Sequence, residues 1–68
     1  MREVAIAGDG IRLGQFLKLA DLVDSGGDVK PLLAAGLVQV NGEVDERRGR
    51  QLRCGDVVTV AGVEVRVA

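Results

Sequence analysis

Two tight-turn signals between Val-rich segments constrain the second half of this sequence to antiparallel β-structure. Residues 37–40 run into Asn41-Gly42, which favours a type I′ turn because both positions tolerate positive φ. Residues 57–60 and 63–67 flank Ala61-Gly62 and predict a second, closing hairpin. Strands joined by such short turns must pair antiparallel.

The first half of the chain changes from an alternating to a helical pattern of apolar residues. Val4 and Ile6 predict a short first strand, which the turn residues Gly8-Asp9-Gly10 end. Four apolar residues then recur at i, i+3, i+4 and i+7, which places them on one face of a helix: Leu13, Phe16, Leu17 and Ala20. Lys18 would face outward from this helix.

A second helix is predicted after a connection at residues 21–24. Ser25 is a good N-cap, and Asp28, three residues later, can complete a pair resembling a capping box. Pro31 would fall in the second turn of such a helix and remove one backbone hydrogen bond. Either the first turn is therefore distorted or the regular helix begins near Pro31. Gly36 is the expected stop.

The predicted elements follow one another in the order β-α-α-β-β-β. This order indicates an α+β fold with two helices packed on a small, mainly antiparallel β-sheet. A chain of 68 residues provides one small core, and we expect residues 1–68 to form a single domain. Because Phe16 is the only aromatic residue, that core must be built from aliphatic side chains.

Composition excludes several classes of function. The chain has no His, Tyr or Trp and no Cys-x-x-Cys, so we expect no enzyme, no metal site and no cofactor. Cys54 has neither a disulfide partner nor an activating base, so we expect a packed side chain and a reducing, cytoplasmic setting. No apolar run approaches the roughly 20 residues that span a bilayer. We expect a soluble monomer.

Two segments are candidates for binding an anion. Ser25-Gly26-Gly27 would open a helix, where free backbone N–H groups attract phosphate, and Lys30 adds a positive charge nearby. Four cations also lie within seven residues: Arg47, Arg48, Arg50 and Arg53. Arginine suits phosphate because its planar fork donates two hydrogen bonds at once. The alternatives are a capped helix and a solvated charge run, the second favoured if Asp45 and Glu46 neutralise the arginines.

The order and spacing of these segments resemble a known family. The matching runs are Leu13-x-x-Phe16-Leu17-Lys18, Ser25-Gly26-Gly27-x-x-Lys30, Gly36-x-Val38-x-Val40-Asn41-Gly42-Glu43, Arg47-x-Gly49-Arg50 and Leu52-x-x-Gly55-Asp56-x-Val58. Together they are similar to the alpha-L RNA-binding motif, the domain named after small-subunit ribosomal protein S-four, in its compact stand-alone bacterial form. The resemblance covers about residues 11–60.

The resemblance implies a non-enzymatic protein that binds structured RNA, ribosomal or transfer RNA, and so possible association with the ribosome. The positions that match the family motif, taken with the glycine-rich helix start, are the candidate RNA contacts: Lys18, Ser25, Gly26, Gly27, Lys30, Asn41, Arg47, Arg48 and Arg50. Asn41 also has a simpler explanation as a turn residue. The sequence pI of about 5.2 means that binding would depend on where the charges lie, not on their sum.

Two other classes of function are open at this point. A protein-interaction or ribosome-associated adaptor without direct RNA binding would agree better with the acidic balance, since the net charge is −1. A β-grasp sulfur carrier is suggested by Val40-Asn41-Gly42-Glu43, but such carriers end in Gly-Gly, whereas this sequence ends in Arg66-Val67-Ala68.

Overall fold

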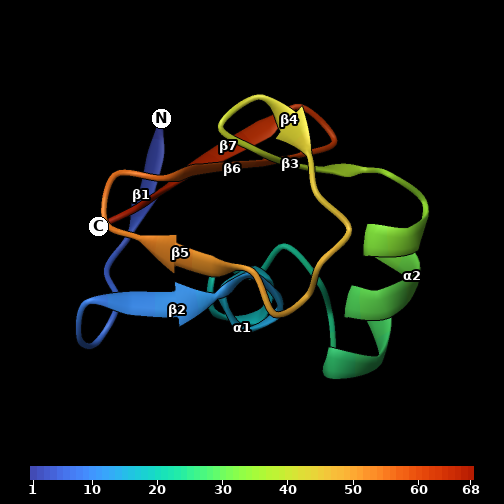
Figure 1. The fold of residues 1–68 in the computed structure, drawn as a ribbon, viewed down its shortest axis with the longest axis horizontal. Coiled ribbons are helices and arrows are strands. Elements are labelled where there is room, and N and C mark those ends of the chain that lie inside the picture. Colours follow the sequence, from blue (N-terminus) through green and yellow to red (C-terminus); the bar gives the residue numbers. More distant parts are fainter.

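The computed structural model describes all residues, 1–68, as a layer of strands with helices on one side (Figure 1). The strands are β1 (Arg2–Val4), β2 (Gly10–Arg12), β3 (Val38–Val40), β4 (Glu43–Val44), β5 (Gln51–Arg53), β6 (Val57–Val60) and β7 (Val63–Val67). The helices are α1 (Leu13–Leu19), a 3₁₀ turn η1 (Gly26–Asp28) and α2 (Val29–Ala34). The α+β class predicted from the sequence is confirmed. None of the helices has the length and apolar character needed to cross a bilayer.

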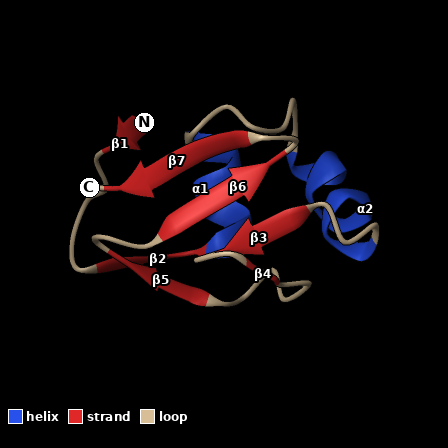
Figure 2. Ribbon diagram, turned by 90° about the horizontal axis from the view of Figure 1, so that it is seen from above, coloured by secondary structure: helices blue, strands red, loops and turns tan.

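The main sheet has the strand order β1-β7-β6-β3-β4. Only β1 and β7 pair in parallel, and all other neighbours are antiparallel. Both predicted hairpin turns are present, because Asn41-Gly42 and Ala61-Gly62 each have two consecutive positive φ angles, of 52° and 86° and of 51° and 80°. Figure 2 shows β7, β6 and β3 side by side over α1.

The core lies between the inner face of this sheet and the helices. All four residues of the predicted helical face are fully buried, which confirms that pattern. The remaining core is aliphatic: Val29 and Leu33 from α2, Leu52 from β5, and Val38, Val40, Val58, Val60, Val65 and Val67 from the sheet. Arg2 ties the N-terminal strand to this layer, since its Nη2 donates to the Ala20 carbonyl oxygen at the end of α1, at 2.6 Å.

The sequence reasoning missed a second sheet. Strands β2 and β5 form an antiparallel pair in which Ile11 lies opposite Leu52. Residues 47–53 are polar and predict an irregular segment, but residues 51–53 form β5, so this prediction is wrong for them. The strands escaped notice because each has three residues, too few for an alternating pattern, and only Leu52 of β5 is buried.

Pro31 is accommodated by a change of helix type. The chain makes one 3₁₀ turn at η1 and enters the α-helix at Val29, so Pro31 lies in the first turn of α2, where its missing N–H costs no hydrogen bond. Both options considered for this segment therefore apply, because the entry is distorted and the regular helix starts two residues before Pro31. Gly36 has a φ of 72° and ends the helical region, as predicted.

Candidate nucleic-acid interface

Residues 47–50, here called the arginine loop, cap the start of helix α1. The N-cap residue Arg12 makes no side-chain cap. Instead, the backbone N–H of Leu13 donates to the Arg50 carbonyl oxygen at 2.8 Å, and that of Gly14 donates to the Arg48 carbonyl oxygen at 2.9 Å. These bonds satisfy N–H groups that a helix start leaves without partners. The loop is consequently fixed against α1.

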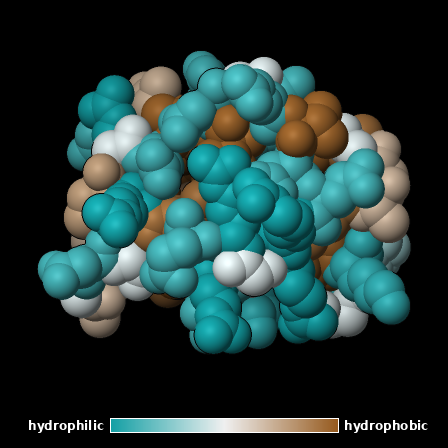
Figure 3. All heavy atoms as spheres, in the orientation of Figure 1, coloured by the Kyte–Doolittle hydropathy of each residue, from teal (hydrophilic) through white to brown (hydrophobic).

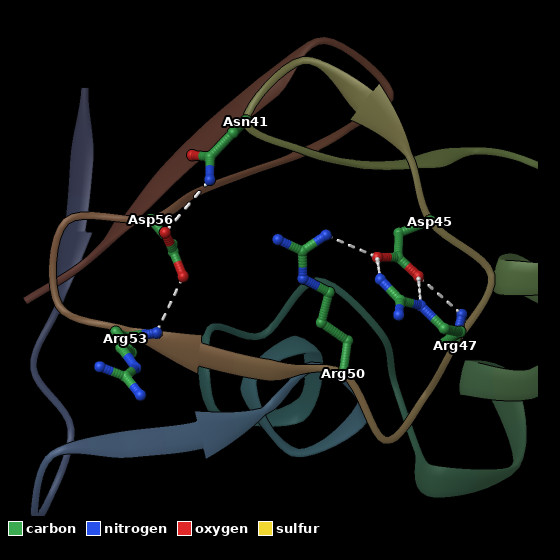
Figure 4. Close-up of polar contacts among 6 residues, drawn as sticks. All are labelled: Asn41, Asp45, Arg47, Arg50, Arg53 and Asp56. Atoms are coloured by element: carbon green, nitrogen blue, oxygen red, sulfur yellow. Dashed lines mark hydrogen bonds and ion pairs between the residues drawn. The ribbon is translucent and has the colours of Figure 1, made fainter.

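A buried carboxylate holds the same loop from its other side (Figure 4). Asp45 is 6% exposed, and its oxygens accept bonds from the backbone N–H and Nε of Arg47, at 2.9 and 3.2 Å. They also accept bonds from Nη2 of Arg47 at 2.9 Å and from Nη1 of Arg50 at 2.8 Å. The guanidinium of Arg47, followed by that of Arg50, holds the pKa of Asp45 well below its usual value, against the opposing effect of burial.

The four arginines of the sequence cluster are thus not equivalent. The Arg50 side chain is 30% exposed and bound to Asp45, whereas that of Arg47 is 72% exposed but has its fork occupied by the same carboxylate. Arg48 is exposed and forms no ion pair. Neutralisation by Asp45, an alternative explanation for this cluster, therefore applies to Arg47 and Arg50, whereas Arg48 in the loop and Arg53 in β5 form no ion pair.

Arg48 lies between two hollows on the surface. One, of about 320 Å³, is lined by Arg12, Gln15, Lys18, Arg48 and Gly49, a set with three cations and no acid. The other, of about 370 Å³, is lined by Lys30, Leu33, Ala34, Glu46 and Arg48. Each hollow thus combines Arg48 with a lysine of one helix, Lys18 of α1 or Lys30 of α2. The face of the molecule seen in Figure 3 is mainly hydrophilic.

The glycine-rich helix entry lies next to Lys18. A Cβ added at Gly26 would come within 3.8 Å of the Lys18 Nζ. The Asp28 carboxylate accepts bonds from the backbone N–H and the hydroxyl of Ser25, at 3.2 and 3.3 Å. Ser25 and Asp28 thus form the capping box that was the alternative explanation for this segment. The negative charge of Asp28 opposes a phosphate at the neighbouring N–H groups of Gly26 and Gly27.

Asn41 lies apart from this surface, and both the nitrogen and the oxygen of its amide form hydrogen bonds within the protein (Figure 4). Its Nδ2 donates to Asp56 at 3.1 Å, and its Oδ1 accepts from the backbone N–H of Val57 at 2.9 Å. Asp56 also accepts from the backbone N–H of Arg53 at 2.8 Å, and this bond is the main reason that its pKa is lowered. Asn41 thus joins the β3–β4 turn to the β5–β6 turn.

The sequence reasoning missed three residues of this region. Arg12 and Gln15 precede Lys18 by six and three residues. Residues spaced by three lie on one side of a helix, and this spacing could have indicated that the three side chains share a surface. Nothing in the sequence around Asp45 indicated that its side chain would be buried.

The prediction for Cys54 was wrong, because its side chain is exposed in the turn after β5. No group of three His, Cys, Asp or Glu side chains could hold a metal ion.

The chain is similar to known proteins in both sequence and fold. The chain is 52% identical over 59 residues to a probable ribosome maturation protein, RlbA, of Bacillus subtilis (strain 168), a match covering 87% of this chain and 83% of the relative. The 30S ribosomal protein S4e of Thermoplasma acidophilum shares the fold, with a TM-score of 0.67 at 23% identity, over 88% of this chain and 32% of that protein. A family model described as the S4 domain matches residues 4–68. The resemblance seen in the sequence is confirmed, and the chain belongs to the S4 domain family.

Proposed function

We propose that this protein binds structured RNA, ribosomal RNA first of all, by contacting phosphates and without catalysing a reaction. The observation that carries the proposal is the hollow lined by Arg12, Lys18 and Arg48, in which cations from β2, α1 and the arginine loop converge without an acid. Lys30 extends this surface through the neighbouring hollow. The S4 domain match and the relative named for ribosome maturation support a ribosomal target.

Phosphate contact agrees with the aromatic content of the chain. Phe16 is the only aromatic residue, and it is fully buried, so no aromatic side chain is available to stack on an unpaired base. Double-helical RNA is recognised largely through its shape and backbone, which a small cluster of cations can contact. The acidic net charge does not oppose this, because Asp45 is buried and paired and Asp28 is bonded to the helix entry.

Salt dependence tests the proposal directly. Fluorescence anisotropy of a labelled ribosomal RNA hairpin, titrated with protein at several salt concentrations, should give a log–log slope of about −3 for three to four phosphate contacts. The triple variant Lys18→Gln, Lys30→Gln and Arg48→Gln should bind at least about tenfold more weakly, with a slope between zero and about −1, because Arg12 remains. Wild-type binding that does not change with salt would contradict phosphate contact.

A matched control is available on the far strands. Arg66 of β7 is exposed and paired with Glu3 of β1 at 3.1 Å, well away from the arginine loop. Arg66→Gln removes one positive charge, as each single change in the triple variant does. It should leave both the affinity and the slope unchanged, so a comparable loss in this variant would show that net charge alone governs binding.

One observation favours a protein-interaction role as a second candidate. Leu37 and Val44 are 55% and 54% exposed. Val44 lies in β4 beside β3, and Leu37 directly precedes β3. A Cβ at Gly36, the neighbour of Leu37, would lie 3.9 Å from Val44 Cγ1, so the two exposed residues belong to one region of the surface. Capture of partners from a lysate with and without ribonuclease separates the two functions, because partners held through RNA are lost on digestion.

A further inference from the structure

The arginine loop has far more internal contacts than a solvated charge run needs. Asp45 accepts four hydrogen bonds, three from Arg47 and one from Arg50. Leu13 and Gly14 of α1 bind the carbonyl oxygens of the loop from the opposite direction. The backbone at Arg48 is therefore held on both sides.

These contacts divide the arginines by their capacity to bind phosphate. A guanidinium recognises an anion best through two parallel N–H groups. In Arg47, Nε and Nη2 form the side-on fork, and both donate to Asp45, whose negative charge also offsets that of the guanidinium. Arg50 is mostly covered and donates to the same carboxylate. Arg48 makes none of the side-chain hydrogen bonds in the structure, so its fork is free for a phosphate.

We propose that Asp45 is a positioning residue of the RNA-binding surface, which holds Arg47 and Arg50 to the protein so that the loop presents Arg48 alone to a phosphate. The inference rests on the proposed function. It adds that the arginine loop supplies one phosphate contact, not three, and that a buried acid decides which arginine supplies it. Arg48 is then held in place before RNA arrives, and less conformational freedom is lost on binding.

Two adjacent arginines give the first test. Arg47→Gln and Arg48→Gln remove the same charge one residue apart, and both side chains are exposed, so neither variant should lose the fold. In the salt titration with the labelled ribosomal RNA hairpin, Arg48→Gln should weaken binding by about fivefold and make the slope less steep by about one. Arg47→Gln keeps the bonds to Asp45 from its own backbone N–H and from Arg50, so the loop should stay in place and the affinity should change by less than about twofold.

Each outcome of this comparison has one meaning. Equal losses in the two variants would overturn the positioning role while leaving the proposed function intact. A larger loss in Arg47→Gln would overturn it as well. Wild-type protein that fails to bind the hairpin or ribosomal subunits would overturn the proposed function and the inference with it.

A double-mutant cycle tests whether Asp45 acts through Arg48. Asp45→Asn should weaken RNA binding several-fold in the wild-type background and have no further effect in the Arg48→Gln background, because coupled residues are not additive. The same loss in both backgrounds, or tighter binding by Asp45→Asn, would overturn the proposal.

Amide hydrogen exchange at Leu13 and Gly14 gives a measurement without RNA. Exchange there should quicken in Asp45→Asn, and unchanged protection would count against the role.

Discussion

The Asp45 carboxylate lies 2.8 Å from Nη1 of Arg50, and this ion pair joins the two sheets of the protein. Asp45 directly follows β4, and its backbone N–H continues the ladder by donating to the Val38 carbonyl oxygen at 3.0 Å. Arg50 directly precedes β5 of the second sheet. The same interaction that organises the arginine loop therefore also connects the main sheet to the β2–β5 pair.

The stability of the protein should depend on the charge of Asp45 in acid. Because the folded state lowers the pKa of Asp45 below its ordinary value of 3.8, the ionised carboxylate stabilises the fold above that value. This contribution is lost as the pH falls below about 4 and the unfolded state takes up the proton first. At pH 7 we expect Asp45→Asn to lower the free energy of unfolding by about 2 kcal/mol. Urea denaturation across this pH range measures the difference.

The difference between the wild type and Asp45→Asn should shrink as the solution is acidified. Asp9→Asn is a matched control, because Asp9 is exposed and takes part in no hydrogen bond or ion pair. It should unfold like the wild type at neutral pH. A difference for Asp45→Asn that stays constant down to low pH would mean that the carboxylate acts by shape and not by charge.

Contact between α1 and the arginine loop should make position 14 intolerant of a side chain. A Cβ at Gly14 would lie 3.3 Å from the Arg48 carbonyl oxygen, which is tighter than ordinary contact, and 3.4 Å from Val29 Cγ1, at the lower limit of ordinary contact. Gly14→Val should therefore destabilise the protein by about 2 kcal/mol, as overpacking does. Gly49→Val is the control within the loop, since nothing lies within 4 Å of a Cβ there. Urea denaturation measures the free energy of unfolding of both variants. Equal decreases in this free energy would contradict close packing at Gly14.

Local features of the structure could be predicted from the sequence, and features that depend on distant residues could not. The Asn41-Gly42 turn and the buried face of α1 are encoded by neighbouring residues, and both appear where expected. The burial of Asp45 arises only when the arginine loop is held against α1, which no local pattern records. For the same reason the sequence cluster identified the arginines but not which of them is free.

Asn41 should prove important for stability and not for RNA binding. Asn41→Gly keeps a residue that adopts positive φ readily but removes the hydrogen bonds to Asp56 and Val57. The loss should lower the free energy of unfolding by about 1–2 kcal/mol. RNA affinity, measured on folded protein, should stay within about twofold of the wild type. A clear loss of RNA affinity without loss of stability would instead show that Asn41 contacts the RNA.

The β6–β7 turn offers a stabilising substitution. Ala61 has a φ of 51°, a conformation that costs a residue with a Cβ about 1–2 kcal/mol. Ala61→Asn would reproduce the Asn-Gly pair found at the β3–β4 turn and should raise the free energy of unfolding by about 0.5–1 kcal/mol. Thermal and urea denaturation measure the gain. Since Ala61 is exposed and lies in the turn, lower stability would contradict a type I′ turn at Ala61-Gly62.

Glu46 should weaken RNA binding in the wild-type protein. It lines the hollow shared by Lys30 and Arg48 but forms an ion pair with neither, so its charge opposes the approach of a phosphate without fixing a cation in place. Glu46→Gln should tighten binding of the ribosomal RNA hairpin by about two- to fivefold at low salt, and the gain should fade as salt screens the charge. Glu64→Gln on the exposed surface of β7 removes an equal charge and should leave affinity unchanged. Equal gains in the two variants would mean that the overall charge of the protein, and not the hollow beside Arg48, sets the affinity.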